Sequence, residues 1–480
     1  MSFNPNLTYF VERLQGFSTN TFRLESQNKT TAQQNDIITF DLPSNAILNL
    51  RSLKVWCNAS AAVGSATAGA RLPPINDLVE RVEVSVGGIV LSQGTNFSNV
   101  LQEAQRALSH EHVDSITGHP EYVRNISYVN ELGAGLAVLT GNKCEDYSTE
   151  TTVKFCIDKF PGFLATAEPK LLDTSILPSL RVRLYMASDN VLTTSAGVAI
   201  GDAIAIAGPP AFEVGFARTG GVGGAKYELS KIHATIEAIG LADESYDSML
   251  SAQMSQQGFL EVPYKSYTSF QEEHAGSSRF TVSTASLDRV WVAWRKKTYN
   301  DQLAPVIVSG HKKEGAYIAG TYATDAAKVL GTNVDLGLPQ YDAGGVLDTN
   351  CEKYKAAYFN FTAPAENMTM QLQLNGAYLP QFSANLGELY GMTKNSLMGS
   401  RDAKDISFKQ YLENYCVQCF RLNMPDSEYS RSMSGLDTRA VNLQGIVSTI
   451  LAGSNSTINI FTEQTEVLRV GAGRAIEIIS

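Results

Sequence analysis

The chain has 480 residues, of which 44% are hydrophobic and 18% charged, which is the composition of a folded globular protein rather than a disordered one. A net charge of -10, with no run of Lys and Arg at either end, argues against direct nucleic-acid binding, which favours a basic face. No stretch reaches the roughly 18 uninterrupted apolar residues of a membrane span, and the start lacks the pattern of a secretory signal. We therefore expect synthesis inside a cell, without secretion.

The first pattern in chain order is amphipathic. Within residues 7–17, four apolar side chains recur at helical spacing, and Thr8 can cap the helix; the four are Phe10, Val11, Leu14 and Phe17. The spacing predicts that residues 1–20 form an arm with a short helix. This helix would lie against a partner surface or pack on its own domain.

From residue 21 onward, strand patterns dominate the first half. Segments rich in β-forming residues and bounded by Pro, Asn or Gly occur at 37–43, 48–60, 78–86, 152–160, 179–187, 211–217 and 226–242. The Gly-rich residues 219–225 lack the Lys-Ser/Thr of a phosphate-binding loop, so we interpret them as a flexible connection. At 243–258 the period becomes helical, which predicts a helix that links two β-domains.

The second half shows strand patterns again, at 259–271, 279–297, 354–364, 368–374, 414–423, 445–453 and 457–470. It carries roughly 50 extra residues at 298–350, which predict an exposed loop or tower. About eight short strands per half fit an all-β fold of two tandem eight-stranded jelly-roll sandwiches, at 21–242 and 259–480, with short helices in the crossovers and the linker.

Two stretches roughly 290 residues apart follow the same plan, and that distance is too long for a solenoid period. Residues 81–93, RVEVSVGGIVLSQ, and 368–379, MTMQLQLNGAYL, both alternate apolar and polar side chains, as half-buried strands do. Each reaches a pair that suits a two-residue hairpin turn, followed by an apolar trio and a helix-like patch. The turn residues are Gly87 and Gly88 in the first copy and Asn375 and Gly376 in the second. One duplicated domain is the simplest interpretation.

The best candidate for chemistry is the pair His110 and His112, which share a face if they lie on a strand, as metal ligands would. Cupins are metal-binding jelly rolls with such a pair and a nearby Glu. Here the next Glu is Glu121, too far along, and the second cupin motif is absent. His110 can instead sit at a helix C-terminus. We expect no metal and no cofactor, and a metal-dependent bicupin enzyme is the first alternative.

The remaining reactive residues point to structural roles. Cys416 and Cys419 are three apart, which puts them on opposite faces of a strand, so we expect buried, reduced thiols rather than a metal or redox pair. No nucleophile elbow occurs, and the other histidines suggest no shared site; these are His233, His274 and His311. We therefore expect no catalytic residues and no enzyme.

Two further patterns are interpreted as structural rather than functional. Trp291 and Trp294 precede the basic residues 295–297, which suggests a sugar or nucleic-acid platform, but a strand core with a solvated basic end is the preferred prediction. Three Asn-x-Ser/Thr sequons fall within or beside predicted strands, where glycosylation lacks access, at Asn58, Asn360 and Asn367.

The order of several segments resembles that of double jelly-roll major capsid proteins, of the type found in polinton-like viruses and virophages. In the first half these are ITFDLPSNAILNLRSLKVW, INDLVERVEVSVGGIVL and LLDTSILPSLRVRLYM. In the second they are LEVPYKSYTSF, LQLNGAYLP, SGLDTRAVNLQG and NIFTEQTEVLRV. Together they span nearly the whole chain, and their order and duplication carry the resemblance.

The resemblance implies a homotrimer with a pseudo-hexagonal outline that tiles an icosahedral shell, located in the virion and assembled inside the host cell. It further implies contacts with neighbouring capsomers and with minor capsid or penton proteins, and an inner membrane as a possible neighbour. Residues 298–350 would form an outer tower, and residues 1–20 would face the interior. A carbohydrate-binding or receptor-binding viral β-sandwich protein is the second alternative.

Overall fold

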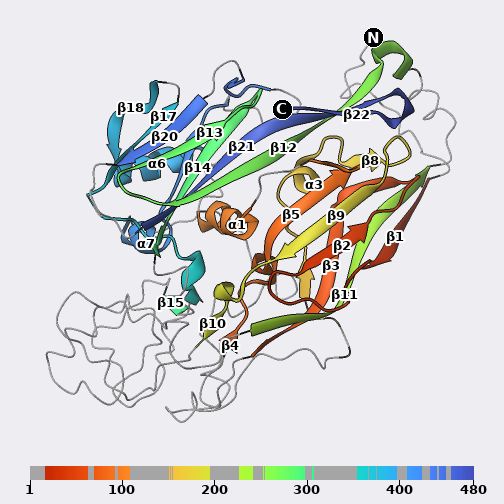
Figure 1. Ribbon diagram of the computed structural model, residues 1–480, viewed down its shortest axis with the longest axis horizontal. Coiled ribbons are helices and arrows are strands. Elements are labelled where there is room, and N and C mark those ends of the chain that lie inside the picture. Colours follow the sequence, from red (N-terminus) through yellow and green to blue (C-terminus); the bar gives the residue numbers. More distant parts are fainter. Residues whose placement is uncertain are drawn as a thin grey trace, which may run out of the picture.

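The fold was analysed in a computed structural model of the chain (Figure 1). The structure describes residues 17–62, 70–91, 96–108, 151, 153, 155–194, 226–241, 252, 254–297, 305–307, 354–365, 367–374, 376–396, 408–423, 433–439, 443–449 and 456–480. Within these residues, no helix is long and apolar enough to cross a membrane.

The first half of the chain forms a sandwich of two antiparallel sheets, called sandwich 1. One sheet has the order β1 (Phe17–Glu25), β11 (Lys226–Leu241), β3 (Ile47–Ala62) and β7 (Phe155–Ile157), with β8 (Leu171–Asp173) also paired to β3. The other has the order β2 (Ile37–Asp41), β9 (Leu180–Met186), β5 (Val79–Val86) and β6 (Ile89–Val90).

The second half repeats this arrangement as sandwich 2. Its first sheet has the order β12 (Phe259–Glu273), β21 (Ser456–Gly471), β14 (Leu287–Lys296) and β19 (Val417–Arg421), with β22 (Ile476–Ile479) on β21. Its second sheet has the order β13 (Ser277–Val282), β20 (Leu443–Thr449), β17 (Thr369–Leu374) and β18 (Ala377–Asn385). Among the described residues, each strand of one four-strand path has a counterpart at the same place in the other sandwich. The predicted fold class, two tandem eight-stranded jelly rolls, is confirmed.

Short helices follow equivalent strands in the two sandwiches. After β6 comes α1 (Ser98–Ala107), and after β18 comes α6 (Leu386–Ser396). The remaining described helical elements are η2 (Ile75–Leu78), α3 (Phe163–Thr166), η5 (Asp189–Val191), η8 (Ala357–Phe359), α7 (Phe408–Asn414) and η9 (Ala472–Arg474). Two small antiparallel ribbons pair β4 (Ala70–Arg71) with β10 (Thr193–Thr194), and β15 (Pro305–Ile307) with β16 (Tyr354–Ala356).

Alternation of apolar and polar residues places the core between the sheets of each sandwich. In β9 and β17, every second residue is buried, since one face of a strand packs on the core and the other faces outward. Strand β21 differs, because its residues are buried continuously from Ser456 to Glu466. Continuous burial shows that both faces of this strand are covered, one by its own sandwich.

The N-terminal boundary differs from the prediction. Strand β1 begins at Phe17 and pairs with β11 from Phe17 opposite Leu241 to Glu25 opposite His233. Residues 17–20 therefore belong to sandwich 1 and not to the predicted arm. The helical spacing misassigned Phe17, because the backbone hydrogen bonds to β11 outweigh the weak strand preference of this polar segment. The rest of the predicted arm lies outside the described residues.

The predicted linker helix and tower fall mostly outside the described residues. Residues 254–257 are helical, and Gly258 follows with a φ of 77°. Of the predicted tower, 298–350, only residues 305–307 are described, as strand β15. Because β15 pairs with β16, the chain leaves and re-enters sandwich 2 at adjacent points.

Candidate functional site at the junction of the two sandwiches

The structure places Gly87 and Gly88 in the two-residue connection between β5 and β6, where Val86 pairs with Ile89. Their φ angles are 57° and 89°, the left-handed region that both central residues of this hairpin turn require. A Cβ atom on Gly87 would also lie 2.7 Å from Cγ of Pro178. In the second copy, Gly376 has a φ of 85°, while Asn375 lies outside the described residues.

Both cysteines of the Cys-x-x-Cys motif are buried in the core of sandwich 2. Burial raises the pKa of the Cys416 thiol to about 12, although a hydrogen bond from Gln418 opposes the shift. Burial also raises the pKa of Cys419. Because the thiolate is the reactive form, these groups are poor nucleophiles and metal ligands at neutral pH.

The histidines do not converge on one site in the part of the chain that the structure describes. Buried His274 contacts the hydroxyls of Ser278 and Thr449, each at 2.7 Å, and packs edge-on against Trp294. Burial lowers its pKa. His233 lies in the other sandwich and contacts the carbonyl of Lys231.

The histidines of the predicted metal site lie outside the described residues. Residues His110, His112 and His311 are not described. Among the described residues, no group of three or more His, Cys, Asp or Glu side chains is placed to hold a metal ion. The bicupin alternative therefore stays a prediction.

The basic end predicted at 295–297 is solvated only in part, because Lys297 is exposed and Lys296 half-buried, whereas Arg295 is fully buried. Its guanidinium donates to the carbonyl of Tyr358 at 2.9 Å and to Oδ1 of Asn459 at 3.3 Å, and it lies 4.6 Å from the centre of the Tyr358 ring. Desolvation lowers its pKa. Trp291 and Trp294 are buried as well, so no exposed aromatic platform exists here. Two sequon residues, Asn58 and Asn360, are also buried, whereas Asn367 is exposed.

A junction of hydrogen bonds and packed side chains joins the two sandwiches, and Tyr264 of β12 takes part in it. The Tyr264 hydroxyl contacts the carbonyl of Leu91 in sandwich 1 at 3.1 Å and Oε2 of Glu466 at 2.6 Å. Its ring packs edge-on against Phe163 of α3, with the ring centres 5.2 Å apart. Burial raises the pKa of Glu466, while its hydrogen bond with Tyr264 lowers it.

Backbone groups also cross the junction. The amide of Glu168 donates to the carbonyl of Pro263 at 3.0 Å. The amide of Lys265 donates to Oγ1 of Thr166 at 2.8 Å. These bonds join the last residue of α3 and the segment after it to β12, and hydrogen bonds are directional, so they help to fix the orientation of the two elements.

A second group of polar side chains lies on the face of the β12–β21–β14 sheet that is turned toward α1. Lys265 Nζ lies 2.5 Å from Oδ2 of Asp288, which also accepts a hydrogen bond from Thr465. Tyr267 is buried beside Gln105 of α1. Paired charges and hydrogen bonds satisfy these buried groups, so the junction is polar as well as buried.

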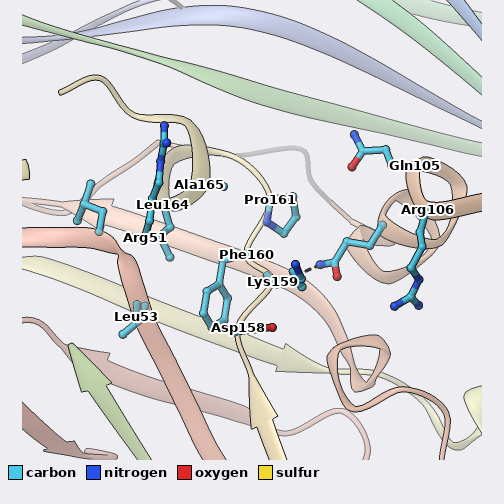
Figure 2. A pocket seen from close by; sticks show the side chains of 12 residues that line it. Arg51, Leu53, Gln105, Arg106, Asp158, Lys159, Phe160, Pro161, Leu164 and Ala165 are labelled. Atoms are coloured by element: carbon cyan, nitrogen blue, oxygen red, sulfur yellow. Dashed lines mark hydrogen bonds between the residues drawn. The ribbon is translucent and has the colours of Figure 1, made fainter. Parts of the chain in front are cut away.

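The junction borders a pocket of roughly 390 Å³ between α1, β3 and residues 158–165 (Figure 2). Its charged rim is partly neutralised, because Arg51 pairs with Glu168 at 3.1 Å and Arg106 with Asp77 at 3.2 Å. The side-chain amide of Gln102 donates a hydrogen bond to the carbonyl of Lys159 at 3.2 Å. The lining residues include no Ser, Cys or His, and their titratable side chains are Arg51, Arg106, Asp158 and Lys159.

The polar groups of this arrangement hold the two sandwiches together. Sequence patterns identify the strands but miss the junction, because its partners are separated by as many as 202 residues, as with Tyr264 and Glu466. The available signal is the polar run TEQTE at 462–466, inside a strand that is otherwise apolar.

Comparisons with known proteins identify the fold. No family model matches the chain, and no curated protein matches it by sequence. Among solved structures, VP54 of the virus PBCV-1, fitted into a reconstruction of the virophage Sputnik, matches with a TM-score of 0.51 and 12% identity over 99% of both chains.

Two further matches have lower scores. The Faustovirus major capsid protein has a TM-score of 0.48 and 10% identity over 97% of this chain and 92% of its own. The mavirus major capsid protein has a TM-score of 0.43 and 10% identity over 99% of this chain and 93% of its own. At the level of the fold, the whole-length match with VP54 confirms the predicted resemblance to double jelly-roll capsid proteins.

Proposed function

We propose that the protein is a major capsid protein whose homotrimer is a building block of an icosahedral viral shell. One observation carries the proposal: the chain contains the same eight-strand unit twice, held together by a buried junction. Three such chains would present six similar units around one axis. A trimer would then fill a hexagonal position in a closed shell.

The structural neighbours support this proposal, because the matched proteins are viral capsid components and the match with VP54 covers the whole chain. A shell also requires no reactive group. The described cysteines and His274 are enclosed in the core, where they pack rather than react. The proposal therefore assigns no enzymatic activity.

The proposed location is the virion, after synthesis and assembly inside the host cell. Neighbouring capsomers are the first partners, and minor capsid or penton proteins would occupy positions that a pseudo-hexagonal block cannot fill. An inner membrane would be the neighbour on the inner side in a shell that encloses one. Direct contact with nucleic acid is not proposed, because the net charge of the chain is -10.

The test is the solution mass of the purified protein by light scattering after size exclusion. We expect a species of about 156 kDa, three times the 52.0 kDa of the chain, with a hexagonal outline in negative-stain electron microscopy. A stable monomer near 52.0 kDa across a range of protein concentrations would contradict the proposal.

A further inference from the structure

At the junction between the sandwiches, one hydroxyl group lies within reach of two hydrogen-bond acceptors. Tyr264 of β12 and Glu466 of β21 are directly opposite each other in the sheet, and the Tyr264 hydroxyl is 2.6 Å from Oε2 of Glu466. The same hydroxyl is 3.1 Å from the carbonyl oxygen of Leu91 in sandwich 1. Because a hydroxyl carries one proton, it donates a full hydrogen bond to only one of these acceptors. Which acceptor receives the bond depends on the protonation of Glu466.

The two protonation states of Glu466 give two different hydrogen-bond patterns. An ionised carboxyl group only accepts, so the Tyr264 hydroxyl donates to it, and the Leu91 carbonyl receives no proton from this hydroxyl. A protonated carboxyl group donates through Oε2 to the Tyr264 oxygen, and the hydroxyl proton then turns to the Leu91 carbonyl. Both short contacts become hydrogen bonds in this second state, and one of them joins sandwich 2 to sandwich 1.

The face of the sheet that carries Glu466 is otherwise uncharged along this part of the two strands. Successive residues of a strand point to opposite faces, so the side chains on this face of β12 and β21 are at even-numbered positions. In 260–270 and 456–470, Glu466 is the one charged residue at an even position. The charged residues at odd positions have ion-pair partners: Arg469 with Glu261, Lys265 with Asp288, and Glu463 with Arg289. From sandwich 1, the neighbours of Tyr264 are the Leu91 carbonyl and the Phe163 ring, which are both uncharged.

The remaining contacts of the Glu466 carboxyl group are polar but neutral. The side-chain amide of Gln464 donates to Oε1 at 2.8 Å, and the Ser266 hydroxyl lies beside the group. None of these described contacts is with a cation, and burial without a cation favours the neutral form of a carboxyl group. Burial accordingly raises the pKa of Glu466 above its ordinary value of 4.5, and the hydrogen bonds offset this only in part. Burial also raises the pKa of Tyr264, so that hydroxyl keeps its proton.

We propose that Glu466 keeps a proton in the folded chain and that this proton directs the Tyr264 hydroxyl to the Leu91 carbonyl, so that the junction is strongest in acid and weakens as the pH rises. The unfolded chain ionises Glu466 at its ordinary pKa, whereas the folded chain retains the proton to a higher pH. The stabilising contribution is therefore complete below the ordinary pKa and is lost as the pH rises through the pKa of the folded chain. This proton-dependent bond lies within one chain and does not depend on the proposed trimer.

Infrared absorption tests whether the proton is present, because the C=O stretch of a protonated carboxyl group is separate from the amide bands. Glu466→Gln removes this carboxyl group but supplies an amide that can donate to Tyr264 and accept from Gln464. At about pH 6, above the ordinary pKa of 4.5 and the isoelectric point of about 5.2, we expect a protonated-carboxyl band that Glu466→Gln lacks. The control is Glu477→Gln on β22, an exposed carboxyl group in the same sheet, which should keep the band. Equal bands in all three proteins would overturn the proposal.

Hydrogen exchange tests whether the proton strengthens the junction, and the wild-type chain suffices for it. The amides of Glu168 and Lys265 donate across the junction, to the Pro263 carbonyl and to Oγ1 of Thr166. Their protection is compared with that of the β9 amides in the same chain, which cancels the direct effect of pH on exchange. Between about pH 6 and pH 9, we expect this relative protection to fall by up to about tenfold per pH unit, until Glu466 ionises in the folded chain. Constant relative protection over this range would overturn the proposal.

A double-mutant cycle tests whether the proton acts through the Tyr264 hydroxyl. Because the amide of Glu466→Gln donates at every pH, this variant should protect the same two junction amides more strongly than the wild type at about pH 9. In a Tyr264→Phe background no hydroxyl can turn to the Leu91 carbonyl, so the gain from Glu466→Gln should be smaller there. An equal gain in both backgrounds would show that burial of the carboxyl group alone causes the effect, and would overturn the proposed role of Tyr264.

Discussion

At the scale of single residues, one sheet of sandwich 2 contains a glycine that has no room for a side chain. Gly445 of β20 lies against the ring of Phe280 in the neighbouring strand β13, and a Cβ atom would come within 2.1 Å of that ring. We expect Gly445→Ala to lower the free energy of unfolding by about 1–3 kcal/mol, the usual cost of overpacking. Urea denaturation monitored by circular dichroism measures this loss.

Gly376→Ala is the control, because a side chain at this position is disfavoured by the backbone conformation and not by a steric clash. Its φ is 85°, and no atom lies within 4 Å of the position that a Cβ would occupy. We expect Gly376→Ala to cost about 1 kcal/mol, the strain of a left-handed alanine. A Gly376→Ala loss equal to or larger than that of Gly445→Ala would contradict the assignment of the two causes.

At the scale of elements, the hydroxyl of Tyr264 connects β12 to sandwich 1. Tyr264→Phe removes the contacts with the Leu91 carbonyl and with Glu466, and it leaves a buried carboxyl group with fewer donors. We expect a loss of about 1–3 kcal/mol in the free energy of unfolding, since an unsatisfied buried group costs its desolvation energy. Thermal and urea unfolding measure the change.

Tyr185→Phe is the matched control for that prediction. The Tyr185 hydroxyl donates to Glu83 at 3.0 Å on a sheet face away from the junction, and Glu83 keeps its ion pairs with Arg183 and Arg81. The loss for Tyr185→Phe should therefore stay below that of Tyr264→Phe. Equal losses would mean that the junction bond contributes no more to stability than a bond whose acceptor keeps other partners.

The elements also show which features sequence patterns can reveal. Alternation of apolar and polar residues predicts β5 and β17 and the hairpins after them. In β17 the period of two follows from one buried face, whereas β5 is buried continuously from Val82 to Val86. The burial of Arg295 is not local, since its acceptors are the Tyr358 carbonyl and Asn459, which lie 63 and 164 residues away. A run of Arg and Lys at a strand end therefore suggests solvent exposure for all its members, although tertiary contacts enclose Arg295.

The junction was missed for the same reason. Its interacting residues come from α1, α3, β12 and β21. The sequence pattern of any one of these segments does not predict which other segments it contacts. The duplication could be inferred from two similar stretches. How the two sandwiches pack on each other depends on side chains that differ between them, such as Tyr267 in β12 and Arg23 in β1.

At the scale of the whole molecule, the predicted tower can be tested as a separable insertion. Ile307 pairs with Tyr354, so a two-residue Asn-Gly turn can replace residues 308–353 and close the β15–β16 ribbon as a hairpin. We expect the shortened chain to fold with an unchanged circular dichroism signature and to form the same oligomer as the full chain. Light scattering and thermal unfolding check both.

A longer deletion shows where the insertion must end. Removing residues 305–359 would also take away Tyr358, whose carbonyl accepts a hydrogen bond from the buried Arg295 at 2.9 Å. That guanidinium would then stay buried without its nearest acceptor, at a cost of roughly 3–5 kcal/mol. We therefore expect the longer deletion to be insoluble or strongly destabilised, while the shorter one is not. An insoluble product from the shorter deletion would instead show that residues 308–353 contribute to the stability of sandwich 2, and the tower interpretation would fail.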